Sequence, residues 1–292
     1  MRISENLQLG LITAGNTIRV TCTNTYLRRK NKAPKMKVNL FDTDGVLVTN
    51  PENMERSLRR ARVSVVDYAL ANRFDYFGTI TFNSKWHDVS NPLACRDAIL
   101  TAFNNYQKRN NREFKYLLVA EYGEKTKRLH FHFLVSGINK DELFINKHHK
   151  LDWSYTADRF GHTQITRIGK TTADHENVAK YCSKYITKGN IRISNHRYFC
   201  SKRLKKPTIT REYSPMLTVL VSDWLEDNMQ EPYVHNRMCK AYSIPKLIYK
   251  DLLEYIEECK RKIAEKPWSF EELDSWTVCP WYLGAGDYML KK

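Results

Sequence analysis

The sequence has 292 residues, and its 48 Lys or Arg against 32 Asp or Glu give a formal net charge of +16 with the histidines neutral. A chain of this length with 42% hydrophobic residues has enough apolar material for one large folded domain or two small ones, which excludes a wholly disordered protein. It contains no run of about 18 apolar residues and no charged N-terminal segment leading into an apolar one, so we expect a soluble protein that is neither secreted nor membrane-bound.

The spacing of the cysteines and the distribution of charge along the chain exclude further classes of protein. The seven cysteines are scattered and form no CxxC pair, which argues against a disulfide framework and against a zinc site built on cysteine. Residues 223–292 hold 10 bases and 13 acids, so the remaining chain carries +19. We therefore expect the surface that binds polyanions within residues 1–222.

The first elements in chain order are short strands and a basic helix. Residues 1–50 read as short strands interrupted by a loop at 27–37 with six Lys or Arg in eleven residues, and Asp44-Gly45 is typical of a hairpin turn. Residues 53–72 have apolar positions at helical spacing and predict an amphipathic helix. Its exposed side would carry Arg56, Arg59, Arg60 and Arg62.

The middle of the chain alternates strands and helices. The composition predicts strands at 75–82, 114–121 and 129–136, a further strand at 163–168, and helices at 94–109 and 173–187, while 138–162 reads as irregular. Beyond them, residues 197–211 hold six bases and no acid, among them Lys202, Arg203, Lys205 and Lys206. A long helix at 245–266 and a Trp-rich end follow, and no P-loop motif is present.

His130 and His132 flank Phe131 in the strand LHFHFL. Residues two apart in a strand point to the same face, so both imidazoles would leave one side of the sheet. Two solvent-facing polar residues on a half-buried strand would give the same pattern. Glu121 closes the preceding strand, and a hairpin could bring its carboxylate beside the imidazoles, although a one-residue slip would turn it away.

Two histidines and one carboxylate with open positions would suit a catalytic divalent cation. Glu121 is the first candidate for the carboxylate and Glu124, in the following loop, is the alternative. An ordinary acid at a strand end would also explain Glu121.

Tyr181 and Tyr185 are four residues apart in a predicted helix, so they would share one face. Lys180, Lys184 and Lys188 surround them, and nearby cations help a phenol act as a nucleophile. The alternative is a pair of core tyrosines with lysines that extend to solvent.

The segments FDYFGTITF, KYLLVAEYGEKTKRLHFHFLVSG and NVAKYCSKYITK, in this order, resemble the three motifs of HUH-type rolling-circle replication initiators. The likeness is to those of small bacterial plasmids and single-stranded DNA phages, including the phage gene II type and microvirus replication proteins, and it covers roughly residues 53–190. His130, Phe131 and His132 match the HUH motif. Tyr181, Lys184, Tyr185 and Lys188 match the form Tyr-x-x-Lys-Tyr-x-x-Lys of the two-tyrosine branch.

The resemblance implies an α+β fold, with a central antiparallel sheet of about five strands flanked by helices. We accordingly expect a basic N-terminal β extension at 1–52, an HUH endonuclease domain at 53–212 and a C-terminal helical extension at 213–292. The role of that last part stays open.

The resemblance also implies a chemistry. His130, His132 and Glu121 would hold Mg²⁺ or Mn²⁺, and a tyrosine would nick origin or single-stranded DNA to leave a 5′-phosphotyrosine and a 3′-hydroxyl primer. Lys184 and Lys188 would neutralise phosphates. The four arginines at 56–62, Lys180 and the four bases at 202–206 would be DNA contacts, or else ordinary solvated surface. Host helicase and polymerase would be partners, in the cytoplasm of a bacterial host.

Four alternatives remain. Ala179-Lys180-Tyr181 also fits one-tyrosine plasmid initiators, which would make Tyr181 the sole nucleophile. An HUH relaxase or transposase is a related possibility, although the spare histidines His148, His149 and His162 lack the context of a relaxase's third ligand. A non-catalytic single-strand-binding protein and a metal-dependent hydrolase that uses water are rivals of other classes.

Overall fold

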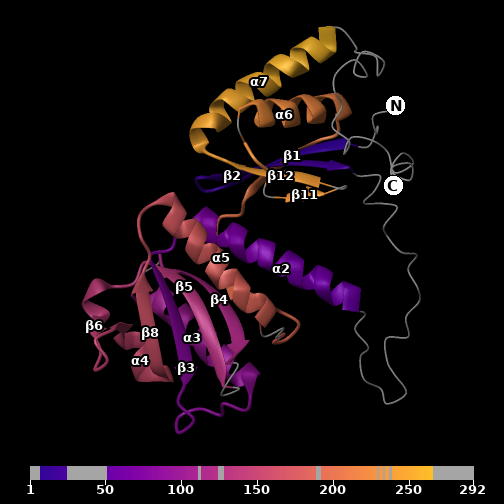
Figure 1. The fold of residues 1–292 in the computed structure, drawn as a ribbon. Coiled ribbons are helices and arrows are strands. Elements are labelled where there is room, and N and C mark those ends of the chain that lie inside the picture. Colours follow the sequence, from indigo (N-terminus) through magenta and orange to yellow (C-terminus); the bar gives the residue numbers. More distant parts are fainter. Residues whose placement is uncertain are drawn as a thin grey trace, which may run out of the picture. The chain divides into compact units, whose positions relative to one another are not determined.

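A computed structural model describes residues 7–24, 51–110, 113–123, 128–188, 192–228, 230–232, 234–236 and 239–265. It shows a mixed α+β protein with antiparallel sheets, which confirms the predicted class (Figure 1). The chain forms two compact units: a central unit, Asn39–Lys206, and a terminal unit that joins Met1–Val38 to Pro207–Lys292. None of the helices in the described ranges has the length and apolar character needed to cross a bilayer.

Several sequence predictions lie outside the described residues. They are the basic loop at 27–37, the Asp44-Gly45 turn, the alternative ligand Glu124 and the Trp-rich end.

The central unit is built on a five-stranded antiparallel sheet of order β8-β3-β5-β4-β9. Its strands are β3 (Tyr76–Phe82), β4 (Lys115–Tyr122), β5 (Leu129–Ser136), β8 (Gly161–Arg167) and β9 (Tyr198–Cys200). The long helices are α2 (Pro51–Asn72), α3 (Pro92–Arg109) and α5 (Thr172–Lys188). The segment predicted as irregular instead holds η1 (Lys140–Glu142), α4 (Ser154–Phe160) and a small ribbon of β6 (Leu143–Ile145) with β7 (Leu151–Trp153).

Alternation along the strands gives this sheet two different faces. Phe131 and Phe133 of β5 are fully buried with Phe103 of α3 and Trp153 in one aromatic core. The intervening residues of β5, His130 and His132, leave the opposite face, as period-2 geometry requires. Helices α2 and α5 pack side by side, and α5 lies against β4 and β5 (Figure 1). The sheet is therefore apolar toward α3 and carries polar side chains toward α5.

Gly78 brings β3 and β5 together above that core. It stands opposite Phe133 on β5, and a Cβ at this position would collide with the Phe133 ring. The glycine therefore leaves space for the ring, with Thr79 next to it on the other face of the sheet.

The terminal unit has its own five-stranded antiparallel sheet of order β10-β1-β2-β12-β11. The strands are β1 (Leu7–Ala14), β2 (Thr17–Asn24), β10 (Thr208–Glu212), β11 (Val234–Asn236) and β12 (Cys239–Ile244). Helices α6 (Pro215–Asp227) and α7 (Lys246–Glu265) contribute to one core with these strands. The regions expected to form separate N-terminal and C-terminal extensions thus share one sheet.

Helix α6 shows no helical periodicity in the sequence because its buried residues follow one another without a break from Met216 to Ser222. Eight of its residues are buried, and the sequence of the helix therefore lacks the regular polar stripe of a surface helix. Its start nevertheless carries a recognisable signal: the Ser214 hydroxyl accepts a hydrogen bond from the Leu217 N–H at 3.3 Å, and Pro215 occupies the first turn. Helices α2, α3, α5 and α7 agree with their predicted ranges to within about two residues at each end.

Candidate active site

Polar side chains form a row across the central sheet. Glu121 on β4 stands opposite His130 on β5, which stands opposite Thr81 on β3. In the adjacent row, His132 stands opposite Thr79. Directly paired residues of antiparallel strands point to the same face, so both histidines, the glutamate and the two threonines share the face toward α5.

The threonines orient both imidazoles. Thr81 Oγ1 lies 2.7 Å from His130 Nδ1, and Thr79 Oγ1 lies 3.0 Å from His132 Nδ1. A hydrogen bond at one ring nitrogen fixes the ring and defines which role the other nitrogen plays. Each imidazole therefore turns its Nε2 away from the threonine that holds it.

Glu121 reaches the second histidine rather than the one opposite it. Its Oε2 lies 2.7 Å from His132 Nε2, and both residues are 7% exposed. The register that brings Glu121 beside the imidazoles is thus the one anticipated from the sequence, and its role as a ligand stays a prediction. Burial and the neighbouring His132 lower the pKa of His130, which favours the neutral imidazole that metals bind.

Within the described ranges, no group of three or more His, Cys, Asp or Glu side chains is arranged so that it could hold a metal ion. The donors nevertheless suit a hard or borderline divalent cation, since they comprise two imidazoles held at Nδ1 and one carboxylate. His130, His132 and Glu121 are the residues that would hold it.

Helix α5 places the two tyrosines over this face. The Tyr185 ring stacks on the His132 ring with centroids 3.5 Å apart and planes at 15°. Tyr181 meets Tyr185 edge-on at 5.2 Å, and Phe77 of β3 contacts both rings. The i, i+4 spacing places both tyrosines on one face of α5, as the sequence predicted, and Tyr185 of this pair contacts His132.

The two tyrosines differ sharply in environment. Tyr185 is 9% exposed and Tyr181 is 45% exposed. Burial, followed by the hydrogen bond to Tyr181, raises the pKa of Tyr185 strongly. Tyr181 is consequently the phenol that a substrate reaches without rearrangement.

One lysine of α5 lies close to the exposed phenol. Lys184 Nζ lies 5.9 Å from the centroid of the Tyr181 ring, within reach of a cation–π contact. Lys180 is exposed, and Lys188 ends the helix. Positive charge at this distance stabilises an anion that forms on the phenol or on a bound phosphate.

Two cavities adjoin the polar row. One, of about 370 Å³, is lined by Phe77, Thr79 and Tyr181 together with side chains of β8. The other, of about 630 Å³, includes Thr81, Arg128, Lys147, His162 and Trp86, whose side chain is 57% exposed. Aromatic and basic groups of this kind bind bases and phosphates of a single strand.

Sequence reasoning missed Thr79 and Thr81, although the alternation in FGTITF placed them on one face. Their role depends on register, which pairs them with the histidines. Trp86 follows β3 in a loop without a motif, so nothing in the sequence singled it out. His162 lies in the first row, but Thr81 stands between it and His130.

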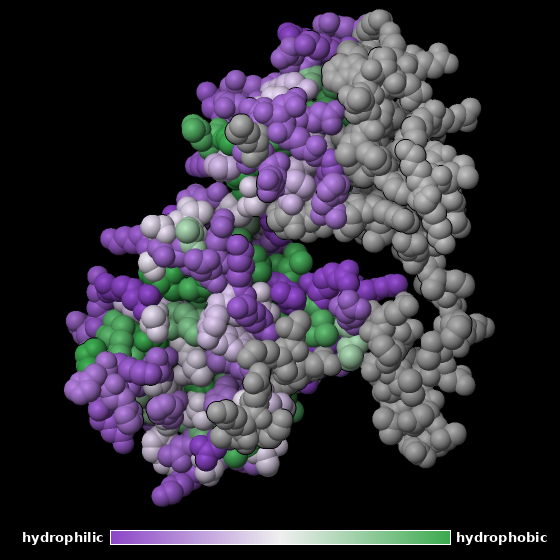
Figure 2. Space-filling model, in the orientation of Figure 1, coloured by the Kyte–Doolittle hydropathy of each residue, from purple (hydrophilic) through white to green (hydrophobic). Residues whose placement is uncertain are grey.

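The predicted DNA contacts on α2 and after β9 are exposed, and three of them, Arg60, Lys202 and Arg203, line one common hollow. Arg56, Arg59, Arg60 and Arg62 are exposed on α2, and Arg59 pairs with Glu55 at 2.8 Å. Lys202, Arg203, Lys205 and Lys206 are exposed after β9. Hydrophilic side chains predominate on the described surface in view, with separate hydrophobic patches between them (Figure 2).

Comparisons with known proteins agree with the motifs. Residues 75–190 match the model of a family of replication-associated proteins that is named for ORF2 and the gene II protein. The chain is also 34% identical over 91 residues to the replication-associated protein VP4 of Bdellovibrio phage phiMH2K, a stretch that spans 28% of each chain. No solved structure matches. These matches confirm the predicted resemblance to replication proteins of the phage type.

Proposed function

We propose that this chain, whose residues 75–190 match the family of replication-associated proteins named for ORF2 and the gene II protein, is a rolling-circle replication initiator that nicks and rejoins single-stranded DNA through a tyrosine. The arrangement that carries the proposal is the stack of Tyr185 on His132, because it places the tyrosine pair of α5 over the face of the sheet that holds the two oriented imidazoles. The antiparallel sheet with helices on both faces is consistent with the HUH fold.

Tyr181 makes the first cut. Its phenolic oxygen attacks the scissile phosphorus, the bond from phosphorus to the 3′-oxygen breaks, and the product is a 5′-phosphotyrosine with a free 3′-hydroxyl. The phenolic proton passes to solvent, and the leaving 3′-oxygen takes one up. One phosphodiester is exchanged for another, so the step needs no nucleoside triphosphate.

Mg²⁺ or Mn²⁺ held by His130, His132 and Glu121 would supply Lewis-acid polarisation of the non-bridging phosphate oxygens. Thr79 and Thr81 keep the imidazoles aligned. Lys184 lies beside Tyr181 and neutralises phosphate charge, while the buried Tyr185 provides the phenol for the second cut after one round of synthesis.

The DNA would lie along the polar row. The two adjoining cavities would receive nucleotides on either side of the scissile phosphate, with Trp86 available to stack on a base. Within the host cell, a polymerase would extend the 3′-hydroxyl and a helicase would open the duplex.

The decisive experiment is a search for a covalent adduct. Labelled single strands that tile the replicon are incubated with the protein and Mn²⁺, then resolved under denaturing conditions. The proposal expects an adduct that disappears in His130→Ala and in the Tyr181→Phe/Tyr185→Phe double variant. Tyr213→Phe, at an exposed tyrosine of the terminal unit, is the matched control and retains the adduct.

Other outcomes identify the rivals. Free 5′-phosphate ends without an adduct would indicate a hydrolase that activates water. Binding without cleavage on any strand would indicate a single-strand-binding protein. The logarithm of the binding constant should fall with the logarithm of salt concentration, with a slope of about −0.7 per phosphate neutralised.

A further inference from the structure

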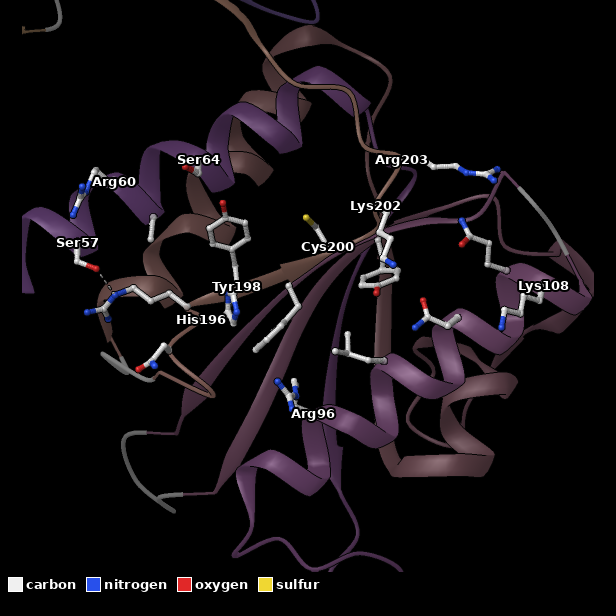
Figure 3. A pocket seen from close by; sticks show the side chains of 18 residues that line it. Ser57, Arg60, Ser64, Arg96, Lys108, His196, Tyr198, Cys200, Lys202 and Arg203 are labelled. Atoms are coloured by element: carbon white, nitrogen blue, oxygen red, sulfur yellow. Dashed lines mark hydrogen bonds between the residues drawn. The ribbon is translucent and has the colours of Figure 1, made fainter.

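A third hollow, of about 980 Å³, runs along β9, the edge strand of the central sheet (Figure 3). Its walls come from α2, α3 and residues 195–203. His130, His132, Tyr181 and Tyr185 are not among its lining residues. We call this hollow the β9 groove.

All the charged side chains that line the β9 groove are positive. Six of its 18 lining residues are Lys or Arg, and none is Asp or Glu. Figure 3 labels five of these cations, which come from α2, α3 and the segment after β9. The six cations are Arg60, Arg96, Lys108, Arg197, Lys202 and Arg203. A concave surface with charge of one sign attracts an anion strongly.

Arg96 has an unmet hydrogen-bond donor in this groove. Its side chain is 14% exposed and its Nη2 pairs with Asp97 at 2.6 Å, but its buried Nε has no hydrogen-bond partner among the described residues. A buried donor without an acceptor costs free energy. A phosphate oxygen in the groove would supply that acceptor.

Arg197 is another cation of the groove, and it lies close to Arg192. It is 8% exposed, and its Nε donates to Ser57 Oγ at 3.3 Å, the same hydroxyl that Arg192 reaches at 3.3 Å. Burial and the neighbouring Arg192 lower the pKa of Arg197. Two guanidinium groups on one hydroxyl are stabilised by an anion close by.

Aromatic rings lie among these cations. The His196 and Phe199 rings are 5.9 Å apart, and the Arg96 guanidinium lies 5.4 Å from the Phe199 centroid. Tyr198 lines the groove as well. Rings that alternate with basic groups bind the bases and the phosphates of a single strand together, whereas a simple polyanion uses only the charges.

We propose that the β9 groove holds a segment of single-stranded DNA away from the scissile phosphate. This inference rests on the proposed function for the identity of the strand. Tyr198 stands opposite Val119, which stands opposite His132, so two strand spacings, about 10 Å, separate the groove from the catalytic row. One continuous strand can occupy both, and the groove retains DNA while its 5′ end is attached to the tyrosine.

The test measures the affinity of labelled thymidine oligonucleotides as a function of salt by fluorescence anisotropy. Lys202→Gln/Arg203→Gln removes two exposed cations of the groove. The expected result is a salt slope reduced by about 1.4, which corresponds to roughly 25-fold weaker binding at 0.1 M salt. Arg96→Gln, as a second variant, should reduce the slope by about 0.7.

The matched control is Arg109→Gln/Lys140→Gln, which removes the same charge at exposed positions of the same unit outside the groove. Equal losses in the groove and control variants would overturn the proposal, because net charge alone would then explain them. Inorganic polyphosphate that displaces the oligonucleotide as well as unlabelled thymidine strands do, at equal phosphate, would also overturn it. Thermal melting verifies that each variant is folded.

The adduct assay on the wild type keeps the two proposals apart. An adduct together with a groove variant that binds like the control refutes the groove alone. Weakened binding by the groove variant without any wild-type adduct refutes tyrosine chemistry alone.

Discussion

Both units bury ionisable side chains against a five-stranded sheet, Lys240 in the terminal unit and Glu121 with His132 in the central one. The Lys240 ammonium contacts Glu226, which accepts a hydrogen bond from the Tyr242 hydroxyl at 2.8 Å, and Tyr242 in turn bonds Ser222 at 3.0 Å. All four residues of this network belong to the terminal unit. In the central unit, Thr79, Thr81 and Tyr181 line two cavities beside the polar row, so a ligand can approach the row from these cavities. Buried charge serves stability in the first unit and, in our proposal, chemistry in the second.

The largest expected effect separates the two tyrosines. Tyr181→Phe should reduce the rate of adduct formation by about 10³-fold or more, because the exposed nucleophile is lost. Tyr185→Phe keeps the ring that stacks on His132 and should stay within about tenfold of wild type for the first cut. Single-turnover adduct formation measures both rates. The reverse ranking would make Tyr185 the first nucleophile.

Lys240→Ala tests the network that Lys240 forms with Glu226 and Tyr242 in the terminal unit. Removing a buried cation and its packed stem should lower the free energy of unfolding by about 3 kcal/mol, measured by urea denaturation. Lys250→Ala, at a side chain that is 81% exposed, should change it by less than about 0.5 kcal/mol. Adduct formation by folded Lys240→Ala should equal that of wild type. A loss of activity without a loss of stability would contradict the division of roles.

The smallest effect concerns the threonines that orient the imidazoles. Thr81→Val keeps the shape but removes the hydroxyl at His130 Nδ1, and Mn²⁺ affinity should fall by about 10-fold to 100-fold. Calorimetric titration with Mn²⁺ measures this change. Thr208→Val, at an exposed strand position of the terminal unit, is the control. Unchanged Mn²⁺ affinity would show that the hydroxyl does not position the ring for metal.

The polar row was largely predictable because its information is local. Period-2 alternation placed His130 and His132 on one face of the sheet, and i, i+4 spacing placed Tyr181 and Tyr185 on one face of α5. Pairing of adjacent strands brought Glu121 beside the histidines. The threonines were visible as an alternation, but their pairing with the histidines depends on the β3–β5 register. No local pattern sets that register.

The terminal sheet and the assembly of the β9 groove were not predictable, because both depend on contacts between segments that are far apart in the sequence. Strand β12 is short and lies far along the chain from β2, its partner. The groove is assembled from α2, α3 and the segment after α5, and each contributes only a few cations that a solvated surface would also show. Contacts between distant segments leave no periodic signal.

The pairing of β2 with β12 also has a consequence for synthesis. Thr23 Oγ1 lies 3.8 Å from Cys239 Sγ across 216 residues of sequence. Ribosomes add roughly 5–20 residues per second, so the β1–β2 hairpin waits about 10–40 s for its neighbour. An isolated hairpin is only marginally stable, whereas every strand of the central sheet emerges within that interval. The central unit is therefore complete on the nascent chain before the terminal sheet can close.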